Sequence, residues 1–374
     1  MNRSDIYPLF LELLVSAIRN RPVKESLFEN VSEETWSLLV RYAGIQRVNA
    51  LIADGVAKLP PEYAPPYSLS ALLTVQTEKI EEANRKLNNI LSEISIENET
   101  VNLPFVLLKG QGNALYYPNP LHRTPGDLDL FFYRQGDYER AKKQVIEKGY
   151  PLEEESIKHQ GYNRGAVHIE NHKTVEVLHL KKIDKKLQRK VKEITDKENF
   201  EIIPINETPI RVLPIEFNAL YLFIHLFHHF VYLGVGMRQI CDWVLYLSAR
   251  HAEIDKKKFT ETAREFHLLR PMRVFAHATV KYLEIPPEIF PFELGEYTPY
   301  SDLVMNDILD GGHFGFYRSG KKRPAGKWSG RWFSFRHAVQ RSWVYASIAP
   351  SYIFTMPIYK FSTRLKLTLK GFRC

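Results

Sequence analysis

The chain has 374 residues, of which 44% are hydrophobic and 25% are charged, and this ordinary composition excludes a long disordered or fibrous protein. A chain of this length exceeds what one hydrophobic core usually organises, so we expect two or more modules. The two cysteines, Cys241 and Cys374, lie far apart in the sequence, which argues against a disulfide framework or a zinc site and favours a reducing compartment.

The net charge of +8 is concentrated at one end of the sequence. Residues 311–374 contain thirteen Lys and Arg, fourteen aromatic residues and no acidic residue. Such a mixture suits a nucleic-acid backbone with stacked bases, and it equally suits an anionic membrane surface. A basic aromatic subdomain packed on the rest of the chain is the third interpretation, and at this stage all three stand.

Residues 1–100 are predicted to be helical, because apolar residues recur there at the spacing of an α-helix. The proline-rich stretch at 60–67 interrupts two of these helices. The N-terminal stretch mixes charged residues into an apolar run, so we expect an amphipathic helix rather than a signal peptide. No run of about 18 apolar residues occurs, and no membrane-spanning helix is expected.

From residue 101 onward the pattern changes to short strands and helices. Apolar runs at 104–110 and 127–133 predict strands, and the segment after each predicts a helix. Residues 164–180 predict a strand, a polar turn at Glu170–Lys173 and a second strand. Residues 200–214 predict another hairpin.

Helical spacing returns at Ile215. The chain is therefore expected to divide into four regions: an N-terminal helical region at 1–100, an α/β domain at 101–213, a C-terminal helical domain at 214–310 and a basic aromatic-rich tail at 311–374.

The stretch RTPGDLDLFFY, residues 123–133, places Asp127 and Asp129 on an otherwise apolar strand. Side chains two residues apart on a strand project from the same face. The two carboxylates would repel each other unless a cation or a proton lies between them. Oxygen ligands of this kind suit Mg²⁺, which usually completes its coordination with phosphate oxygens of a substrate.

Residues on either side of this pair point to the same chemistry. Upstream, a predicted strand ends in Lys109-Gly110-Gln111-Gly112 and a helix follows, an arrangement that presents backbone amides to a phosphate. Downstream, Glu176 lies within an apolar alternation. It would supply a third carboxylate, as in sites where two metal ions bind the attacking and leaving oxygens.

Other polar residues have a structural interpretation. His225, His228 and His229 lie in an apolar segment, so packed or hydrogen-bonded histidines are favoured over metal ligands. We expect Arg238 and Asp242 to pair with each other or to brace the catalytic domain.

Three further residues near the acids are open to two readings each. His168 and His179 lie on either side of Glu176, and hydrogen-bonded sheet histidines are favoured there over contacts with a nucleotide. Arg123 either contacts a phosphate or neutralises the two aspartates when no ligand is bound.

The pattern K-G-x(12)-R-x(3)-D-x-D, followed by a hydrophobic strand that ends in E-x-x-H, resembles the nucleotidyltransferase superfamily typified by DNA polymerase beta. More closely, the chain is similar to a group of uncharacterised bacterial nucleotidyltransferases. The segments that carry this resemblance are LLKGQGNALYYPNPLHRTPGDLDLFF, KTVEVLHL and HLFHHFVYLGVGMRQICDWVLYL. The resemblance covers roughly residues 30–270 and leaves the tail unexplained.

The resemblance implies an α+β fold. In this fold a small polymerase-beta-like nucleotidyltransferase domain, a mixed sheet with helices, is inserted between the N-terminal and C-terminal helical regions. It implies that Asp127, Asp129 and Glu176 are the catalytic residues and the ligands of Mg²⁺, or of Mn²⁺ in its place. The implied contacts with nucleotide phosphates are Lys109, Gly110, Gln111 and Arg123. The superfamily usually has a serine after the glycine of this turn, whereas Gln111 stands here.

The implied reaction is the transfer of a nucleoside monophosphate from a nucleoside triphosphate to an acceptor, with release of pyrophosphate. The acceptor is a small molecule, a glycan, a protein or an RNA. We expect a cytoplasmic protein or one peripheral to the inner face of the membrane. Two alternatives stand beside this function. One is a catalytically inactive nucleotidyltransferase-fold protein that binds or scaffolds, and the other is a D-x-D sugar-nucleotide-dependent glycosyltransferase at the membrane surface.

Overall fold

The computed structural model describes residues 3–178, 180–313, 329, 332, 336 and 345–352. Its α-helices are α1 (Tyr7–Arg19), α2 (Glu33–Gln46), α3 (Asn49–Val56), α4 (Tyr67–Thr100), α5 (Gly110–Ala114), α6 (Asp137–Glu147), α7 (Lys181–Asp196), α8 (Ile215–Tyr232), α9 (Met237–Arg250), α10 (Lys256–Glu265), α11 (Leu269–Leu283) and α12 (Tyr300–Gly311). Its strands are β1 (Val106–Leu108), β2 (Leu128–Phe131), β3 (His159–Arg164), β4 (Val167–His172), β5 (Glu201–Ile205) and β6 (Thr208–Val212).

Helices occupy the predicted N-terminal region, and helices return after residue 214, as expected. None of the helices in the described ranges is long and apolar enough to cross a membrane. Most of the tail predicted at 311–374, and with it the choice among the three interpretations of its role, lies outside the described residues.

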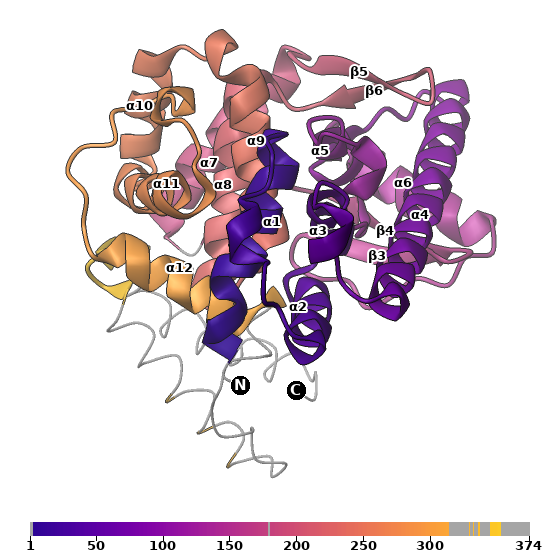
Figure 1. Cartoon of the computed structure of the whole chain (residues 1–374). Coiled ribbons are helices and arrows are strands. Elements are labelled where there is room, and N and C mark those ends of the chain that lie inside the picture. The colour runs from indigo at the N-terminus through magenta and orange to yellow at the C-terminus, as the bar shows by residue number, and fades with distance from the viewer. Residues whose placement is uncertain are drawn as a thin grey trace.

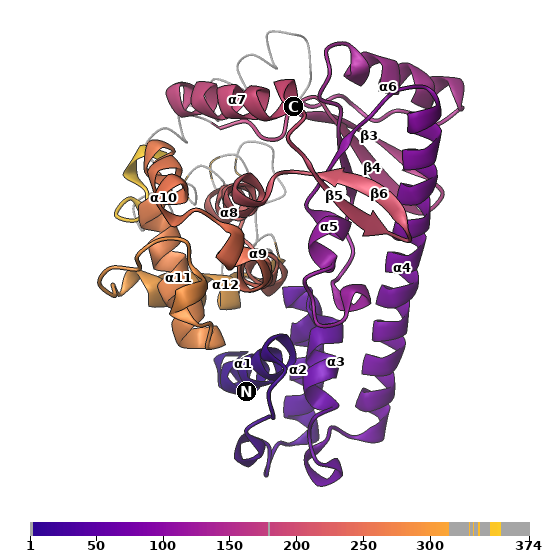
Figure 2. The same cartoon turned by 90° about the horizontal axis from the view of Figure 1, so that it is seen from above.

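The centre of the fold is a six-stranded mixed sheet with the strand order β3-β4-β2-β1-β6-β5. Strand β2 runs parallel to β4 and β1 runs parallel to β6, whereas the other neighbours are antiparallel. Helices α4 and α6 share a core with one face of the sheet, and α7 and α8 pack on the other (Figure 1). Figure 2 shows α4 running past the sheet on the side away from α8 and α9. The predicted division into four regions stays a prediction.

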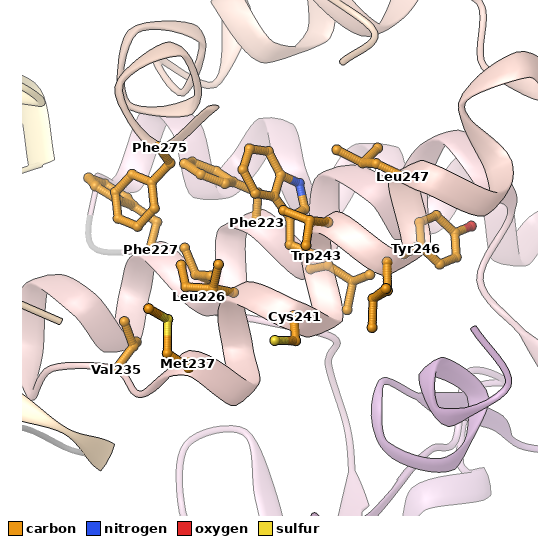
Figure 3. Close-up of a cluster of buried hydrophobic side chains, with 14 of the residues drawn as sticks. Phe223, Leu226, Phe227, Val235, Met237, Cys241, Trp243, Tyr246, Leu247 and Phe275 are labelled. Atoms are coloured by element: carbon orange, nitrogen blue, oxygen red, sulfur yellow. The ribbon is translucent and has the colours of Figure 1, made fainter. Parts of the chain in front are cut away.

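Helices α8 and α9 form the apolar centre of the helical part. Figure 3 shows Phe223 and Phe227 of α8 close to Trp243 of α9 and Phe275 of α11. The ring centroid of Phe223 lies 4.9 Å from that of Trp243 and 5.4 Å from that of Phe275. Because α8 is covered by the sheet and by helices, it is apolar around most of its circumference. This packing fixes α8 above one face of the sheet.

The hairpin predicted at residues 200–214 is confirmed. Strands β5 and β6 pair in an antiparallel register that closes at Ile205 and Thr208. The two residues between them, Asn206 and Glu207, have φ values of 46° and 63°. A pair of left-handed residues is the turn whose twist matches the strands on either side.

The turn predicted at Glu170–Lys173 is wrong. Strand β4 continues through Glu170 to His172, and it pairs with β3 through a turn at residues 165–166. Gly165 has a φ of 61°, which a glycine adopts at little steric cost. The polar residues of β4 therefore mark one face of a strand rather than a turn. Helix α7 also lies within the predicted α/β domain, and the sequence pattern did not predict it.

Gly55 allows the close approach of α3 to α1. A Cβ atom at residue 55 would lie 2.4 Å from the carbonyl oxygen of Leu13, so Gly55→Ala should force the helices apart and lower the free energy of unfolding by about 1–3 kcal/mol. Thermal unfolding measures the effect. The control is Gly44→Ala on α2, where the nearest atom to the new Cβ is 3.5 Å away and alanine should stabilise by about 0.5–1 kcal/mol. An unchanged melting temperature for Gly55→Ala would contradict the close approach of α3 to α1.

Candidate active site

One face of the sheet carries a row of polar side chains on the side of α8. In β2, Leu128 belongs to the core shared with α4 and α6, so the period of two places Asp129 on the opposite face. The parallel register sets Asp129 beside Glu170 of β4, and the β3 register sets His159 beside His172. Acids and histidines from β2, β3, β4 and the residue before β2 therefore lie together on this face. We call these side chains the polar row: Asp127, Asp129, His159, His168, Glu170 and His172.

The turn between β1 and α5 delivers a lysine to this row. Leu108, the last residue of β1, pairs with Asp129, and Lys109 follows with φ 47° and ψ −137°. Such a backbone is strained for a residue with a side chain, at a cost of about 1–3 kcal/mol. The Lys109 Nζ atom lies 3.1 Å from Asp129 Oδ2. Gly110 follows with φ 50°, and a Cβ there would lie 3.5 Å from the carbonyl oxygen of Asp127, so the turn packs on the segment that enters β2.

Asp129 is buried and is compensated by a lysine and a histidine. Besides Lys109, His172 approaches it, with Nε2 2.9 Å from Asp129 Oδ1 and 3.2 Å from Glu170 Oε2. Burial acts to raise the pKa of Asp129, but the charge of Lys109 and the hydrogen bond from His172 hold it well below its ordinary value. Burial acts to lower the pKa of His172, and its bonds to the two carboxylates raise it overall. Asp129 is therefore a permanent anion.

Asp127 lies at the open end of the polar row. Its side chain is about half exposed, and partial burial together with the negative charges of Asp129 and Glu170 raises its pKa. Two groups of side chains within the described residues bring their ligand atoms within 4.8 Å of one another: Asp127 with His168 and Glu170, and His159 with Glu170 and His172. A cation between these side chains would offset the repulsion that Asp127 experiences from Asp129 and Glu170.

Glu176, the third acid expected from the sequence, is buried and outside these two groups. Its Oε1 accepts hydrogen bonds from Lys158 Nζ at 2.8 Å and from the backbone N–H of Val177 at 2.9 Å. Its Oε2 lies 3.9 Å from Nδ1 of His225. Burial acts to raise the pKa of Glu176, but the neighbouring His225 and the charge of Lys158 lower it more strongly.

The acid that lies directly across from Asp129 is Glu170, which the sequence analysis assigned to a turn. The alternation of V-H-I-E-N-H at 167–172 predicts its position. Val167 and Ile169 are buried on the face of α4, so the period of two places His168, Glu170 and His172 on the opposite face, in the polar row. The metal-binding role predicted for Glu176 stays a prediction.

Helix α4 anchors the two loops that lead to the site. The Nε2 of Gln111 donates to Asn88 Oδ1 at 2.6 Å, so this predicted phosphate contact faces α4 rather than the two aspartates. Asn84 donates to the carbonyl oxygens of Leu121 at 2.7 Å and of Arg123 at 2.8 Å. These bonds fix the loop that leads into β2.

Two of the three histidines of α8 face the site. The rings of His225 and His229 contact each other edge to face, with centroids 4.4 Å apart, which fits the packed histidines that the sequence favoured. Burial and the charge of Lys109 lower the pKa of His225 to about 4, although Glu176 opposes this effect. His225 is therefore neutral at pH 7. His179 lies outside the described residues.

Arg123 and Asp242 form a buried bidentate ion pair. Nε and Nη2 of Arg123 lie 2.8 and 3.0 Å from the two oxygens of Asp242, and the hydroxyl of Tyr117 donates to Asp242 Oδ1 at 2.8 Å. Arg238 instead donates to backbone carbonyls at residues 124–125. Asp242 thus braces α9 against the loop that leads into β2, as predicted, with Arg123 rather than Arg238 as its partner.

A cavity of about 190 Å³ opens beside Asp127 and Asp129. Its walls come from Arg47 after α2, the turn before α5, the loop into β2, helices α8 and α9, and His313 after α12. A larger cavity of about 570 Å³ at α11 is lined by none of the residues of the polar row. The smaller cavity is therefore the candidate active site, because it alone of the two is lined by Asp127 and Asp129 together with Lys109.

Comparison with known proteins points to one class of enzyme. A family model described as uncharacterised nucleotidyltransferase matches residues 32–284, a range that contains the whole sheet, α8 and α9. Among solved structures, the chain is similar to an antigenic nucleotidyltransferase-like protein from Paracoccidioides brasiliensis, with 13% identity and a TM-score of 0.37, over 53% of this chain and 92% of that chain. No curated protein matches the chain.

Removal of Asp242 should strongly destabilise the protein, because it leaves the buried guanidinium of Arg123 without its anion. We expect Asp242→Ala to lower the free energy of unfolding by about 3–5 kcal/mol, as measured by urea denaturation. Asp196→Ala is the matched control on α7, since its ion pair with Lys192 is exposed and should contribute about 0.5 kcal/mol or less. Similar losses of unfolding free energy in the two variants would show that the Arg123–Asp242 pair is not desolvated.

His122 should make stability depend on pH. Its ring nitrogens lie 2.8 Å from Asp54 Oδ2 and 3.0 Å from Glu81 Oε1. Burial acts to lower the pKa of His122, but the two carboxylates raise it overall. The stabilisation of the folded state by these ion pairs is then fully present below the unfolded-state pKa of His122, about 6.5. It is lost as the pH rises through the higher folded-state pKa. The unfolding free energy lost in His122→Gln should be larger at about pH 6 than at about pH 9. A loss independent of pH would contradict the ion pairs.

Proposed function

Because the chain belongs to the family described as uncharacterised nucleotidyltransferase, whose model matches residues 32–284, we propose that it transfers a nucleoside monophosphate from a nucleoside triphosphate to an acceptor hydroxyl group. One observation supports this most directly. Asp127 and Asp129 border a cavity together with the Lys109-Gly110 turn, and Glu170 lies beside them. Acids next to a phosphate-binding type of turn suit phosphoryl chemistry.

The carboxylates fit a divalent cation. Burial, together with the charges of two neighbouring acids, raises the pKa of Asp127. The donor atoms available to an ion there include carboxylate oxygens, which Mg²⁺ and Mn²⁺ both accept. We assign Asp127 and Asp129 as the residues that would hold the ion. Glu170 is the third carboxylate by geometry, and Glu176 is the third by sequence pattern. When bound, such an ion neutralises phosphate charge and makes the acceptor hydroxyl group more acidic.

The transfer makes one bond and breaks another. The acceptor oxygen bonds to the α-phosphorus, while the bond from that phosphorus to the oxygen bridging the β-phosphate breaks, and its electron pair leaves with pyrophosphate. The acceptor proton passes to a carboxylate. Asp127 suits this role because its pKa is raised, whereas Lys109 and His172 occupy the oxygens of Asp129. Asp129 is therefore the less suitable proton acceptor of the two.

One contact favours a second candidate function. The ammonium group of Lys109 lies 3.1 Å from Asp129 Oδ2. Burial acts to lower the pKa of the lysine, but the charge of Asp129 raises it overall. A lysine that stayed there permanently would neutralise the carboxylate that a metal ion needs. The chain would then bind a nucleotide or a partner without turnover.

Labelled nucleotides distinguish the two candidates. The protein is incubated with Mg²⁺, whole-cell extract and each of the common nucleoside triphosphates radiolabelled at the α-phosphate. We expect one extract fraction to acquire label, and Asp127→Asn or Asp129→Asn should reduce the rate at least about 100-fold. Asp196→Asn, exposed on α7, should leave the rate unchanged.

Calorimetry of the same nucleotides with Mg²⁺ completes the test. Binding by the wild type without transfer of label to any fraction would support the second candidate. An absence of both binding and transfer, or binding that the two aspartate variants do not alter, would refute the proposed enzyme.

A further inference from the structure

The candidate cavity holds a second set of charged side chains, which have no part in the transfer step described above. Of this set, only Arg123 is expected from the family resemblance to contact a phosphate. Arg47, Arg123 and Arg238 line it together with His313. They come from the end of α2, the loop before β2, the first turn of α9 and the segment after α12. Three guanidinium groups therefore meet at the cavity that also holds Asp127.

Arg238 is held in place without an acidic hydrogen-bond partner among the described residues. Its Nη1 donates to the carbonyl oxygens of Thr124 at 3.3 Å and Pro125 at 3.2 Å. Its Nε is buried and has no hydrogen-bond partner within the described part of the chain. The guanidinium fits closely over Gly126, where a Cβ would lie 3.3 Å from Nη1. Burial and the charge of Arg123 lower the pKa of Arg238 to about 10, so it remains charged at pH 7.

Arg123 and Arg47 complete the basic set. Nη1 of Arg123, a residue only 4% exposed, is buried with no hydrogen-bond partner in the described ranges, while its other two nitrogens bind Asp242. Arg47 has its backbone fixed by the hydroxyl of Thr124, which donates to its carbonyl oxygen at 2.7 Å. The side chain of Arg47 is exposed at the rim. Its charge and that of Arg123 both act to lower the pKa of Arg238.

The carboxylates of the cavity do not balance the positive charge of these three arginines. Asp242 is bound by Arg123 and Tyr117, and Asp129 is bound by Lys109 and His172. Asp127 is the remaining carboxylate of the cavity lining. Guanidinium groups that repel one another around a cavity are stabilised by an anion, and their planar donor geometry matches the oxygens of phosphate.

We propose that this part of the cavity is a polyphosphate-binding subsite, in which Arg238, Nη1 of Arg123 and Arg47 bind the β- and γ-phosphates of the nucleotide and the pyrophosphate that leaves. The assignment of the anion to a nucleotide rests on the proposed function. A volume of about 190 Å³ is below the roughly 300–1,000 Å³ of pockets that enclose a whole ligand. The subsite therefore holds the phosphates, and the nucleoside lies outside it.

Calorimetric titration with inorganic pyrophosphate, in the presence of EDTA and without a divalent metal, tests the subsite separately from catalysis. Wild-type protein should bind pyrophosphate, and Arg238→Gln should weaken binding about tenfold or more, because a hydrogen-bonded charge is lost. Arg47→Gln should weaken it less, because Arg47 is exposed. The control is Arg273→Gln on α11, which also donates to a backbone carbonyl but lines the larger cavity at α11, and it should leave binding unchanged.

Circular dichroism and thermal unfolding show whether each variant folds. If Arg238→Gln does not fold, Arg47→Gln decides, because an exposed side chain is not needed for folding. Failure of the wild type to bind pyrophosphate, or equal binding by the folded arginine variants, would overturn the subsite. Pyrophosphate binding that depends on Arg238, in a protein that transfers no label, would instead confirm the subsite and refute the proposed enzyme.

Discussion

A carboxylate buried beneath a helix is costly unless cations and hydrogen bonds compensate it, and much of this fold is arranged around one such group. Asp129 has a side chain that is 4% exposed. The strained backbone at Lys109 brings an ammonium group to one of its oxygens, and strand β4 brings His172 to the other. A change in the turn before α5 would remove Lys109 from this carboxylate, and a change in the register of β4 would remove His172.

The parts of the site that are local in sequence could be predicted from the sequence. Asp129 lies on a strand because apolar residues surround it, and Asp127 lies directly before that strand. The period of two places both acids on one face. The Lys-Gly turn and the hairpin at 200–214 also depend on residues close together in the chain. Steric and hydrogen-bonding preferences of a few residues decide such features.

The parts that depend on pairing between distant segments could not be predicted. Glu170 follows the same alternation as Asp129, but its polar neighbours suggested a turn, and only the parallel register of β2 with β4 sets the two acids side by side. The sequence left open whether Arg238 and Asp242, one helical turn apart, pair with each other or brace the catalytic domain. A bidentate bond to Arg123, with its better geometry, replaces that pair.

The cavity is assembled from segments that are remote in the chain, since Arg47, the two aspartates, α8, α9 and His313 all border it. The aspartates themselves lie on β2 and in the loop before it, within the sheet. A fragment limited to the sheet would keep the acids and lose most of the surrounding walls. Evolution can therefore alter what this cavity accepts by exchanging residues in the helices at either end of the sequence, without any change to the strands that carry the acids.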